Sequence, residues 1–265
     1  MRISYAFFTM LLLASCGDDN TSKPAESKGS SPDSISVSEE EITDPEATEV
    51  WEPEPEVISF DEQGIPSDAR VLFNGEDLSA WKSTKDTITN APWIINSDGT
   101  FTVNPGSGDI MTKEEFGDIQ LHLEWRAPQE IVGEGQGRGN SGIFLQDKYE
   151  VQILDSYNNR TYSNGQATSI YKQQAPLVNA TKAPSEWQKY DIIYHQPEFN
   201  DAGEQTKAGT ITLMHNGVLV QDHVEIQGTT EYIGKPKNIA HGAGPLKLQD
   251  HGNPVSFRNV WVRPI

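Results

Sequence analysis

The chain has 265 residues, of which 39 are acidic and 20 are basic, and its formal net charge is −19. The basic residues form no patch or stripe, which excludes a typical nucleic-acid-binding surface. The single cysteine, Cys16, excludes disulfides and a thiolate metal cluster, while the length allows one sizeable domain with a buried core.

The first 15 residues are expected to be a lipoprotein signal peptide. Arg2 precedes an apolar run over residues 5–13, which is too short to span a membrane as a stable helix. The run ends in Leu13-Ala14-Ser15-Cys16, which resembles the bacterial lipobox, where cleavage before the cysteine is followed by its lipidation. The alternative is a plain signal peptide with an incidental cysteine. We expect Cys16 to anchor the protein in the cell envelope, at the outer membrane or the cell surface.

Residues 16–66 are expected to be the lipidated cysteine followed by a disordered acidic linker. Between residues 17 and 66 there are fifteen acidic residues and two lysines, so −13 of the formal charge lies here. A segment with so few apolar side chains cannot bury enough surface to offset its ordering entropy. Its first residues, Gly17-Asp18-Asp19, resemble the acidic export signal of surface lipoproteins in the Bacteroidetes.

Residues 67–265 are predicted to form one all-β domain. Apolar and polar residues alternate over residues 118–126, and further strands are predicted at residues 93–95, 100–103, 187–195, 209–215, 246–249 and 255–262. Asn216-Gly217 predicts a type I′ hairpin turn, and Trp81 is expected to anchor the core. Helical periodicity is nearly absent. Many short antiparallel strands indicate a two-sheet β-sandwich or jelly roll.

The strand predicted within residues 149–156 carries the candidate site. Its apolar residues alternate with Glu150 and Gln152, so the acid and the amide share the face that points away from the core. Asp155 is out of phase by one residue and joins that face only if a bulge falls near Leu154. A row of acid, amide and acid suits sugar binding or sugar cleavage. The alternative is a half-exposed strand whose polar side chains meet water.

Several sequence blocks together resemble the 3-keto-disaccharide hydrolase family, over essentially all of residues 68–264. They include Leu72-Phe73-Asn74-Gly75-Glu76-Asp77-Leu78 and Gly139-Asn140-Ser141-Gly142-Ile143, and then residues 149–156, 186–187, 215–224 and 248–264. The resemblance implies a concanavalin A-like jelly-roll β-sandwich of two antiparallel sheets, with a sugar site on the concave sheet. It also implies cleavage of 3-keto-glycosides by proton abstraction at C2 and elimination or hydrolysis of the C1 substituent. A separate sugar 3-dehydrogenase would supply these substrates.

The implied chemistry needs groups that transfer protons and groups that bind the enolate oxygen. We assign the proton transfers to Glu150 or His251, and sugar binding or orientation to Gln152, Asn140 and Arg126. His251 lies in a predicted turn, where an imidazole can exchange protons. The alternative is a turn histidine that is hydrogen-bonded to the backbone.

Each of the other candidate site residues also has an ordinary structural explanation. Glu124 is the next catalytic candidate, because it shares a strand face with Arg126, but that face could be a surface ion-pair ladder. Tyr171 could stack on a sugar ring or belong to the core. Asp250 could orient His251 or simply start a turn.

A more distant resemblance is to the family 16 glycoside hydrolases, whose bulged catalytic strand has the form Glu-x-Asp-x-x-Glu. The matching positions here are Glu150, Gln152 and Asp155. An amide replaces the carboxylate that tunes the pair, and the last acid is one methylene shorter. This departure argues against an ordinary retaining double displacement.

Two other functions stay open at this stage. One is a non-catalytic, lectin-like carbohydrate-binding module, since a fold alone does not assign chemistry. The other is conventional hydrolysis of a β-glucan, which would need two suitably spaced carboxyl groups. The sequence predicts no cofactor and, lacking His-x-His or His-Glu-x-x-His spacing, no metal.

Overall fold

The computed structural model describes residues 42–86 and 88–265. The chain divides into a first unit that ends at Pro55 and a compact second unit, Glu56–Ile265. The predicted signal peptide, Cys16 and most of the predicted linker lie outside the described residues. Within the described part, no helix is long and apolar enough to cross a bilayer.

The described part of the first unit contains one short element, the 3-10 helix η1 (Pro45–Thr48). Asp44 precedes it, and its carboxylate accepts a hydrogen bond from the amide of Glu46 at 3.0 Å. This contact satisfies one of the free amides at the start of the helix.

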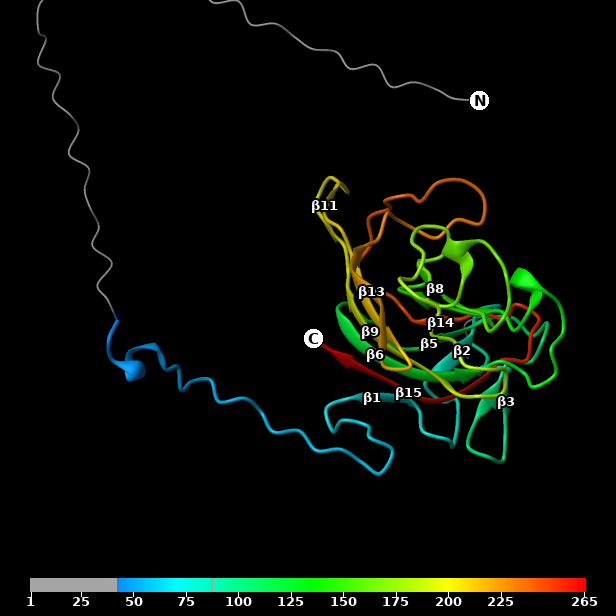
Figure 1. Cartoon of the computed structure of the whole chain (residues 1–265), viewed down its shortest axis with the longest axis horizontal. Coiled ribbons are helices and arrows are strands. Elements are labelled where there is room, and N and C mark those ends of the chain that lie inside the picture. Colours follow the sequence, from blue (N-terminus) through cyan, green and yellow to red (C-terminus); the bar gives the residue numbers. More distant parts are fainter. Residues whose placement is uncertain (1–41, 87) are drawn as a thin grey trace, which may run out of the picture. The chain divides into compact units, whose positions relative to one another are not determined.

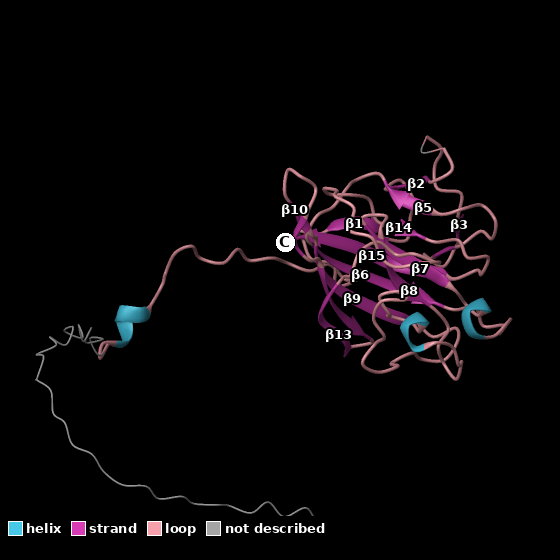
Figure 2. Cartoon of the chain, turned by 90° about the horizontal axis from the view of Figure 1, so that it is seen from above, coloured by secondary structure: helices cyan, strands magenta, loops and turns pink. Residues whose placement is uncertain are grey.

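The second unit contains two antiparallel β-sheets (Figures 1 and 2). The large sheet has the order β13 (Val218–Glu225), β12 (Thr210–His215), β9 (Gln188–His195), β6 (Ile119–Arg126), β15 (Ser256–Pro264), β4 (Phe101–Thr102) and β3 (Ile94–Ile95), and β1 (Arg70–Phe73) also pairs with β15. The small sheet has the order β2 (Trp81–Ser83), β5 (Ile110–Thr112), β14 (Lys247–Leu248), β7 (Ser141–Leu145) and β8 (Tyr149–Ile153). A separate ribbon pairs β10 (Glu198–Phe199) with β11 (Gln205–Lys207), and the remaining helical turns are η2 (Gly135–Gly137) and η3 (Ser163–Gly165). The prediction of an all-β jelly-roll sandwich is confirmed.

Apolar residues from both sheets form one continuous core. In β6 the buried positions Leu121, Leu123 and Trp125 alternate as predicted, and they meet Val151 and Ile153 of β8 in the same cluster. Because successive side chains of a strand point to opposite faces, the residues between them face outward on each sheet. The candidate site residues are therefore divided between two outer faces, one for each sheet.

Trp81 is fully buried, as expected for an anchor. Its indole nitrogen donates a hydrogen bond to the carbonyl of Leu72 at 2.9 Å. The ring therefore links β2 of the small sheet to β1 of the large sheet. It packs near Phe101, whose ring also lies 4.6 Å from Phe73 and 5.3 Å from Phe257 between centroids. Such aromatic contacts add to the free energy gained from burial alone.

The Asn216-Gly217 turn between β12 and β13 is confirmed. Both residues have positive φ, 54° and 81°, and they connect the paired residues His215 and Val218. A type I′ turn needs positive φ at both central positions, which asparagine and glycine tolerate.

Candidate active site

A cleft of about 740 Å³ lies on the outer face of the small sheet, beside β7 and β8. Five of the sequence-predicted site residues line it: Glu150, Gln152, Asn140, Tyr171 and His251. They come from segments that are far apart in the sequence, and the sandwich brings them together. The other residues that line the cleft are Gln136, Gly137, Phe144, Tyr162, Lys172, Thr230, Tyr232 and Gln249.

Glu150 lies at the floor of the cleft and is only 5% exposed. Its carboxyl group leans over Gly142 of the neighbouring strand β7, where a Cβ atom would lie 2.7 Å from its Oε1. The same Cβ would lie 3.2 Å from the ring of Phe144. A glycine is therefore required at position 142 for the carboxyl group to lie where it does.

Burial dominates the electrostatics of Glu150. Removal of the carboxyl group from water raises its pKa to about 8, although the positive charge of Lys247 acts in the opposite direction. Lys247 is itself paired with Asp147 at 2.6 Å, and Asp109 adds a smaller repulsion that also raises the Glu150 pKa. The carboxyl group consequently carries its proton at neutral pH.

Gln136 fixes the orientation of two amides on one wall of the cleft. The side-chain nitrogen of Asn140 donates to the Gln136 carbonyl at 2.6 Å, and that of Gln152 donates to Gln136 Oε1 at 2.9 Å. Within the described residues, Asn140 Oδ1, Gln152 Oε1 and Gln249 Oε1 are buried without a hydrogen-bond partner. Buried polar atoms normally find a partner, but these three oxygens are closed to solvent, so a ligand hydroxyl would reach them only after the side chains turn toward the cleft.

A pair of tyrosines also lines the cleft. The hydroxyl groups of Tyr162 and Tyr171 lie 2.6 Å apart, and the two rings meet edge to face. Burial raises the pKa of Tyr171, and its hydrogen bond with Tyr162 raises it further. Both phenols therefore keep their protons, and because one O–H satisfies the contact between them, the other can donate into the cleft.

His251 is an exposed turn residue at the edge of the cleft. The carboxylate of the preceding residue, Asp250, accepts hydrogen bonds from the amides of Gly108 at 2.9 Å and Gly252 at 3.0 Å. These contacts tie the turn to the loop before β5. Of the two roles considered for Asp250, the structure therefore favours support of the turn over orientation of the His251 ring.

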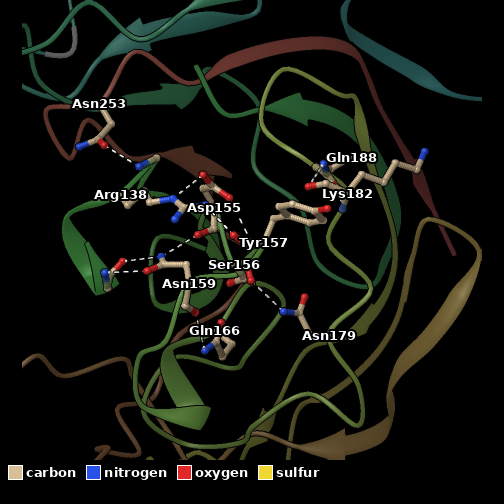
Figure 3. A network of polar contacts seen from close by, with 12 residues as sticks. Arg138, Asp155, Ser156, Tyr157, Asn159, Gln166, Asn179, Lys182, Gln188 and Asn253 are labelled. Carbon is tan, nitrogen blue, oxygen red and sulfur yellow. Dashed lines mark hydrogen bonds and ion pairs between the residues drawn. The ribbon is translucent and has the colours of Figure 1, made fainter. Parts of the chain in front are cut away.

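Asp155 does not join the row formed by Glu150 and Gln152. Strand β8 ends at Ile153, and the Asp155 carboxylate accepts a hydrogen bond from Arg138 Nε at 2.7 Å (Figure 3). The ion pair lies in a separate hollow of about 230 Å³. Asn253 also lines this hollow, and its Oδ1 accepts a hydrogen bond from the amide of Gly139 at 2.7 Å. The expected sugar contact of Asp155 is therefore replaced by a structural ion pair.

Glu124 and Arg126 lie on the large sheet, outside the cleft. The Glu124 carboxylate is paired with Arg258 at 2.6 Å and with Lys189 at 3.4 Å. Burial opposes its ionisation, but hydrogen bonds from His122 and Arg258 and the charges of Arg258 and Lys189 outweigh burial and lower its pKa to about 2. The face that Glu124 shares with Arg126 is the ion-pair ladder that was the alternative in the sequence analysis.

Arg126 is held in the same way on this face. Its guanidinium lies 4.6 Å from the centroid of the Trp187 ring, and its Nη2 lies 3.3 Å from Asp98 Oδ2. Arg126 therefore cannot orient a sugar beside Glu150. The sequence pattern correctly predicted that Arg126 lies on an outer face, but this face belongs to the large sheet and not to the cleft.

The sequence analysis missed Gln136, Gln249 and Tyr162 as parts of the site. Gln136 lies in the single helical turn η2 and Tyr162 directly precedes η3, where the sequence has no periodic pattern, and Gln249 directly follows the two-residue strand β14. A glutamine beside a glycine-rich segment is an ordinary loop residue in a sequence. Its role emerges only from contacts between distant segments.

Comparison with known proteins identifies relatives of the whole second unit. A 3-keto-disaccharide hydrolase of Bacteroides thetaiotaomicron is 24% identical over an alignment of 257 positions, gaps included, which covers 77% of this chain and 82% of the relative. The crystal structure of a Parabacteroides distasonis protein, provisionally named a glycosyl hydrolase, is 52% identical with a TM-score of 0.80, covering 84% of this chain and 97% of the other. A second structure from that organism, with 20% identity, a TM-score of 0.53 and coverage of 75% and 94%, shares the fold.

The family itself is identified from the match to its sequence model. That model describes a 3-keto-alpha-glucoside-1,2-lyase-like domain and matches residues 68–263. The match covers both sheets except Pro264, the last residue of β15, and it includes every residue that lines the cleft. The resemblance proposed from the sequence blocks is therefore confirmed, and this chain belongs to the family of 3-keto-alpha-glucoside-1,2-lyase-like domains.

Proposed function

We propose that this protein cleaves 3-keto-glycosides by removing the proton on C2 and expelling the substituent on C1. The observation that carries the proposal is the buried Glu150, which holds its proton at neutral pH in a cleft lined by amide side chains and tyrosines. The description of the family as 1,2-lyase-like and the name of the Bacteroides thetaiotaomicron relative support the same chemistry.

The proposed reaction begins at C2, whose hydrogen is acidified by the ketone at C3. His251 takes this proton, and the electrons of the C2–H bond form an enolate whose oxygen accepts the free O–H of the tyrosine pair, Tyr162 and Tyr171. The C3 ketone then re-forms, a C1=C2 double bond forms and the C1–O bond breaks. Glu150 gives its proton to the departing oxygen, so the products are an unsaturated 3-keto sugar and an alcohol.

The pKa of Glu150 suits the role of acid. A carboxylic acid with an ordinary pKa is ionised at pH 7 and has no proton to give, whereas burial keeps Glu150 protonated up to about pH 8. An alcohol leaving group needs such a proton, because an alkoxide departs slowly. General acid catalysis of this kind typically contributes about 10²- to 10⁴-fold in rate.

Hydrolysis is the alternative to elimination as the overall reaction. Addition of water across the new C1=C2 bond gives the 3-keto sugar, so that elimination and hydration together equal hydrolysis. The name of the Bacteroides thetaiotaomicron relative supports this version. In D₂O the two-step route places deuterium on C2 of the product faster than uncatalysed exchange of that acidic hydrogen, whereas direct displacement at C1 adds no label beyond that exchange. Mass spectrometry of the product distinguishes the routes.

A conventional glycosidase mechanism fits the cleft less well. Such a mechanism uses two carboxyl groups that flank the glycosidic bond. Among the described residues that line the cleft, Glu150 is the only carboxylic acid. We therefore expect the unoxidised parent glycoside to remain intact.

The test compares release of the alcohol from a 3-keto-glucoside and from its unoxidised parent. The purified protein should cleave only the keto substrate, and Glu150→Gln and His251→Ala should each lose at least about 100-fold in kcat/KM. Glu124→Gln is the matched control, since it makes the same change on the other sheet and should retain activity. Cleavage of the parent would indicate a conventional glycosidase. Binding without release of either alcohol would indicate a lectin-like module.

The proposed substrate also implies a second enzyme that prepares it. A ketone at C3 must be made by oxidation of the sugar, so we propose a functional link to a sugar 3-dehydrogenase. We further propose that Cys16 is lipidated and that the protein acts in the cell envelope. Labelling of cells with a fatty-acid probe should mark the intact protein and not the Cys16→Ser variant.

A further inference from the structure

A loop over residues 229–237 forms one side of the cleft and carries an exposed tyrosine, Tyr232. The loop is closed on itself, because the amide of Thr229 donates to the Lys237 carbonyl at 2.9 Å and Lys237 Nζ lies 3.0 Å from Glu231 Oε1. At its base, Gly228 has φ 141°, and a Cβ there would lie 2.7 Å from the Lys237 carbonyl oxygen. The conformation of the loop therefore depends on this glycine.

The loop is attached directly to the strand that carries Glu150. The amide of Thr230 donates to the Lys148 carbonyl at 2.8 Å, and the Thr230 hydroxyl accepts the amide of Glu150 at 2.9 Å. These two bonds fix the loop beside the carboxyl group that we assign as the acid. Tyr232 lies two residues further along, so its position relative to Glu150 is also constrained.

Tyr232 presents an aromatic ring at the open end of the cleft. The residue is 75% exposed and yet lines the cleft, in contrast to Tyr171, which is 9% exposed. Lys172 holds it in place, because its Nζ donates to the Tyr232 carbonyl at 2.6 Å and lies 4.3 Å from the centroid of the ring. An exposed ring held in this way is not explained by packing in the core.

The residues that line the cleft consequently differ in exposure, and we call the two groups its buried end and its open end. The buried end has Asn140 and Gln152, which are 3% and 1% exposed, whereas the open end has the exposed side chains of Tyr232 and Lys172. Glu150 is tied to the loop of the open end through Thr230. The volume of about 740 Å³ lies in the upper part of the roughly 300–1,000 Å³ range that binding pockets for small molecules occupy, so more than a single sugar ring can enter.

We propose that Tyr232 is the stacking platform for the leaving group, taking that group to be the second sugar ring that the name of the Bacteroides thetaiotaomicron relative implies. The apolar face of a pyranose would lie on the phenol ring, and Lys172 would donate hydrogen bonds to its hydroxyl groups. The inference rests on the proposed function, because it takes the oxidised ring to occupy the buried end. The glycosidic oxygen then lies between the two ends, where Glu150 can protonate it.

Kinetics on two substrates with the same oxidised ring test this assignment. Tyr232→Ala should lose about tenfold in kcat/KM on a 3-keto-disaccharide, whereas its kcat/KM on methyl 3-keto-glucoside should change less than about twofold. Ile233→Ala is the matched control, since Ile233 is 83% exposed, neighbours Tyr232 and does not line the cleft. It should leave both substrates unaffected.

Two outcomes would overturn the assignment. An equal loss on both substrates would mean that Tyr232 binds the oxidised ring, and no loss on either would mean that it binds neither ring. A nitrophenyl 3-keto-glucoside provides a third arm. A larger loss on this substrate than on the disaccharide would assign the platform to aromatic leaving groups instead of sugars.

Binding measurements separate this inference from the proposed reaction. Calorimetric titration of the 3-keto-disaccharide into Glu150→Gln should give about tenfold weaker binding when Tyr232→Ala is added. If the wild-type protein cleaves no keto substrate but this loss of affinity is observed, the proposed reaction fails and the platform stands. If cleavage is observed and the affinity does not change, the reaction stands and the platform fails. Thermal melts of the variants check that each one folds.

Discussion

Two buried glutamates on opposite outer faces of this sandwich have opposite acid–base properties. Glu150 and Glu124 are 5% and 4% exposed, yet their pKa values are about 8 and about 2. Burial raises both values, but only Glu124 has hydrogen bonds from His122 and Arg258 and the charges of Arg258 and Lys189 to reverse the effect. The comparison teaches that burial alone does not decide the charge of a carboxyl group. Direct hydrogen bonds and nearby cations decide it together with burial.

The largest effect should come from disturbing the position of the Glu150 carboxyl group. In Gly142→Ala the new methyl group would lie 2.7 Å from Oε1 and must displace it, so we expect a loss of about 100-fold in kcat/KM on a 3-keto-glucoside. Gly137→Ala is the control, because Gly137 also lines the cleft but a Cβ there meets nothing within 4 Å. Equal activity of the two variants would contradict the close approach.

The second prediction concerns the paired glutamate. Glu124→Gln removes the charge that Arg258 and Lys189 compensate, and should lower the free energy of unfolding by about 2 kcal/mol while activity is retained. The value is below that for a fully buried pair, because Arg258 and Lys189 side chains are 40% and 52% exposed. Urea denaturation measures the change. A loss of activity without a loss of stability would return Glu124 to the list of catalytic candidates.

The third prediction is that the two glutamates make stability depend on pH in opposite directions. The raised pKa of Glu150 gives a contribution that is complete below pH 4.5 and is lost as the pH rises toward 8. The lowered pKa of Glu124 gives a contribution that is complete above pH 4.5 and is lost as the pH falls toward 2. Each slope is at most about 1.4 kcal/mol per pH unit.

Urea midpoints of the variants against pH check these signs. Relative to the wild type, Glu150→Gln should become more stable between pH 5 and pH 8, because glutamine never has to ionise. The stability deficit of Glu124→Gln should shrink below pH 4.5, where the wild type itself loses the ion pair. Differences from the wild type that stay constant with pH would refute the opposite shifts.

The smallest effect should come from the cation near Glu150. Lys247 lowers the Glu150 pKa against the larger effect of burial, so Lys247→Met should raise that pKa further. In the wild type, kcat/KM should fall above about pH 8 as the acid loses its proton, and in the variant this fall should begin at higher pH. Lys189→Met, beside Glu124, is the control and should leave the pH profile unchanged.

The features that sequence analysis predicted correctly are local. Alternation in β6 and β8 identified the buried faces, and Asn216-Gly217 identified a turn, because each pattern depends on neighbouring residues. Alternation also placed Glu124 and Glu150 on outward faces. It could not tell that these are outer faces of different sheets, since strand order depends on contacts between residues far apart in the chain.

The features that sequence analysis missed are set by such distant contacts. Gln136 belongs to the site because the fold places it within hydrogen-bond distance of both Asn140 and Gln152. Asp155 does not line the cleft, because its carboxylate is paired with Arg138. The sequence resemblance could point to blocks that belong to the cleft, but it carried no information about which atoms of an amide face the ligand. That choice depends on the partner of each nitrogen.

The orientation that Gln136 imposes on the two amides also bears on how the proposed substrate would lie in the cleft. Gln136 holds the side-chain nitrogens of Asn140 and Gln152, so one donor of each amide is already engaged. An unoxidised glucose ring offers a hydroxyl donor at C3, whereas a 3-keto ring offers only a lone-pair acceptor there. The free O–H of the Tyr162–Tyr171 pair is a donor for that acceptor, so we expect the oxidised carbon to face the tyrosines. Hydrogen-bond polarity would then orient the ring before any proton moves.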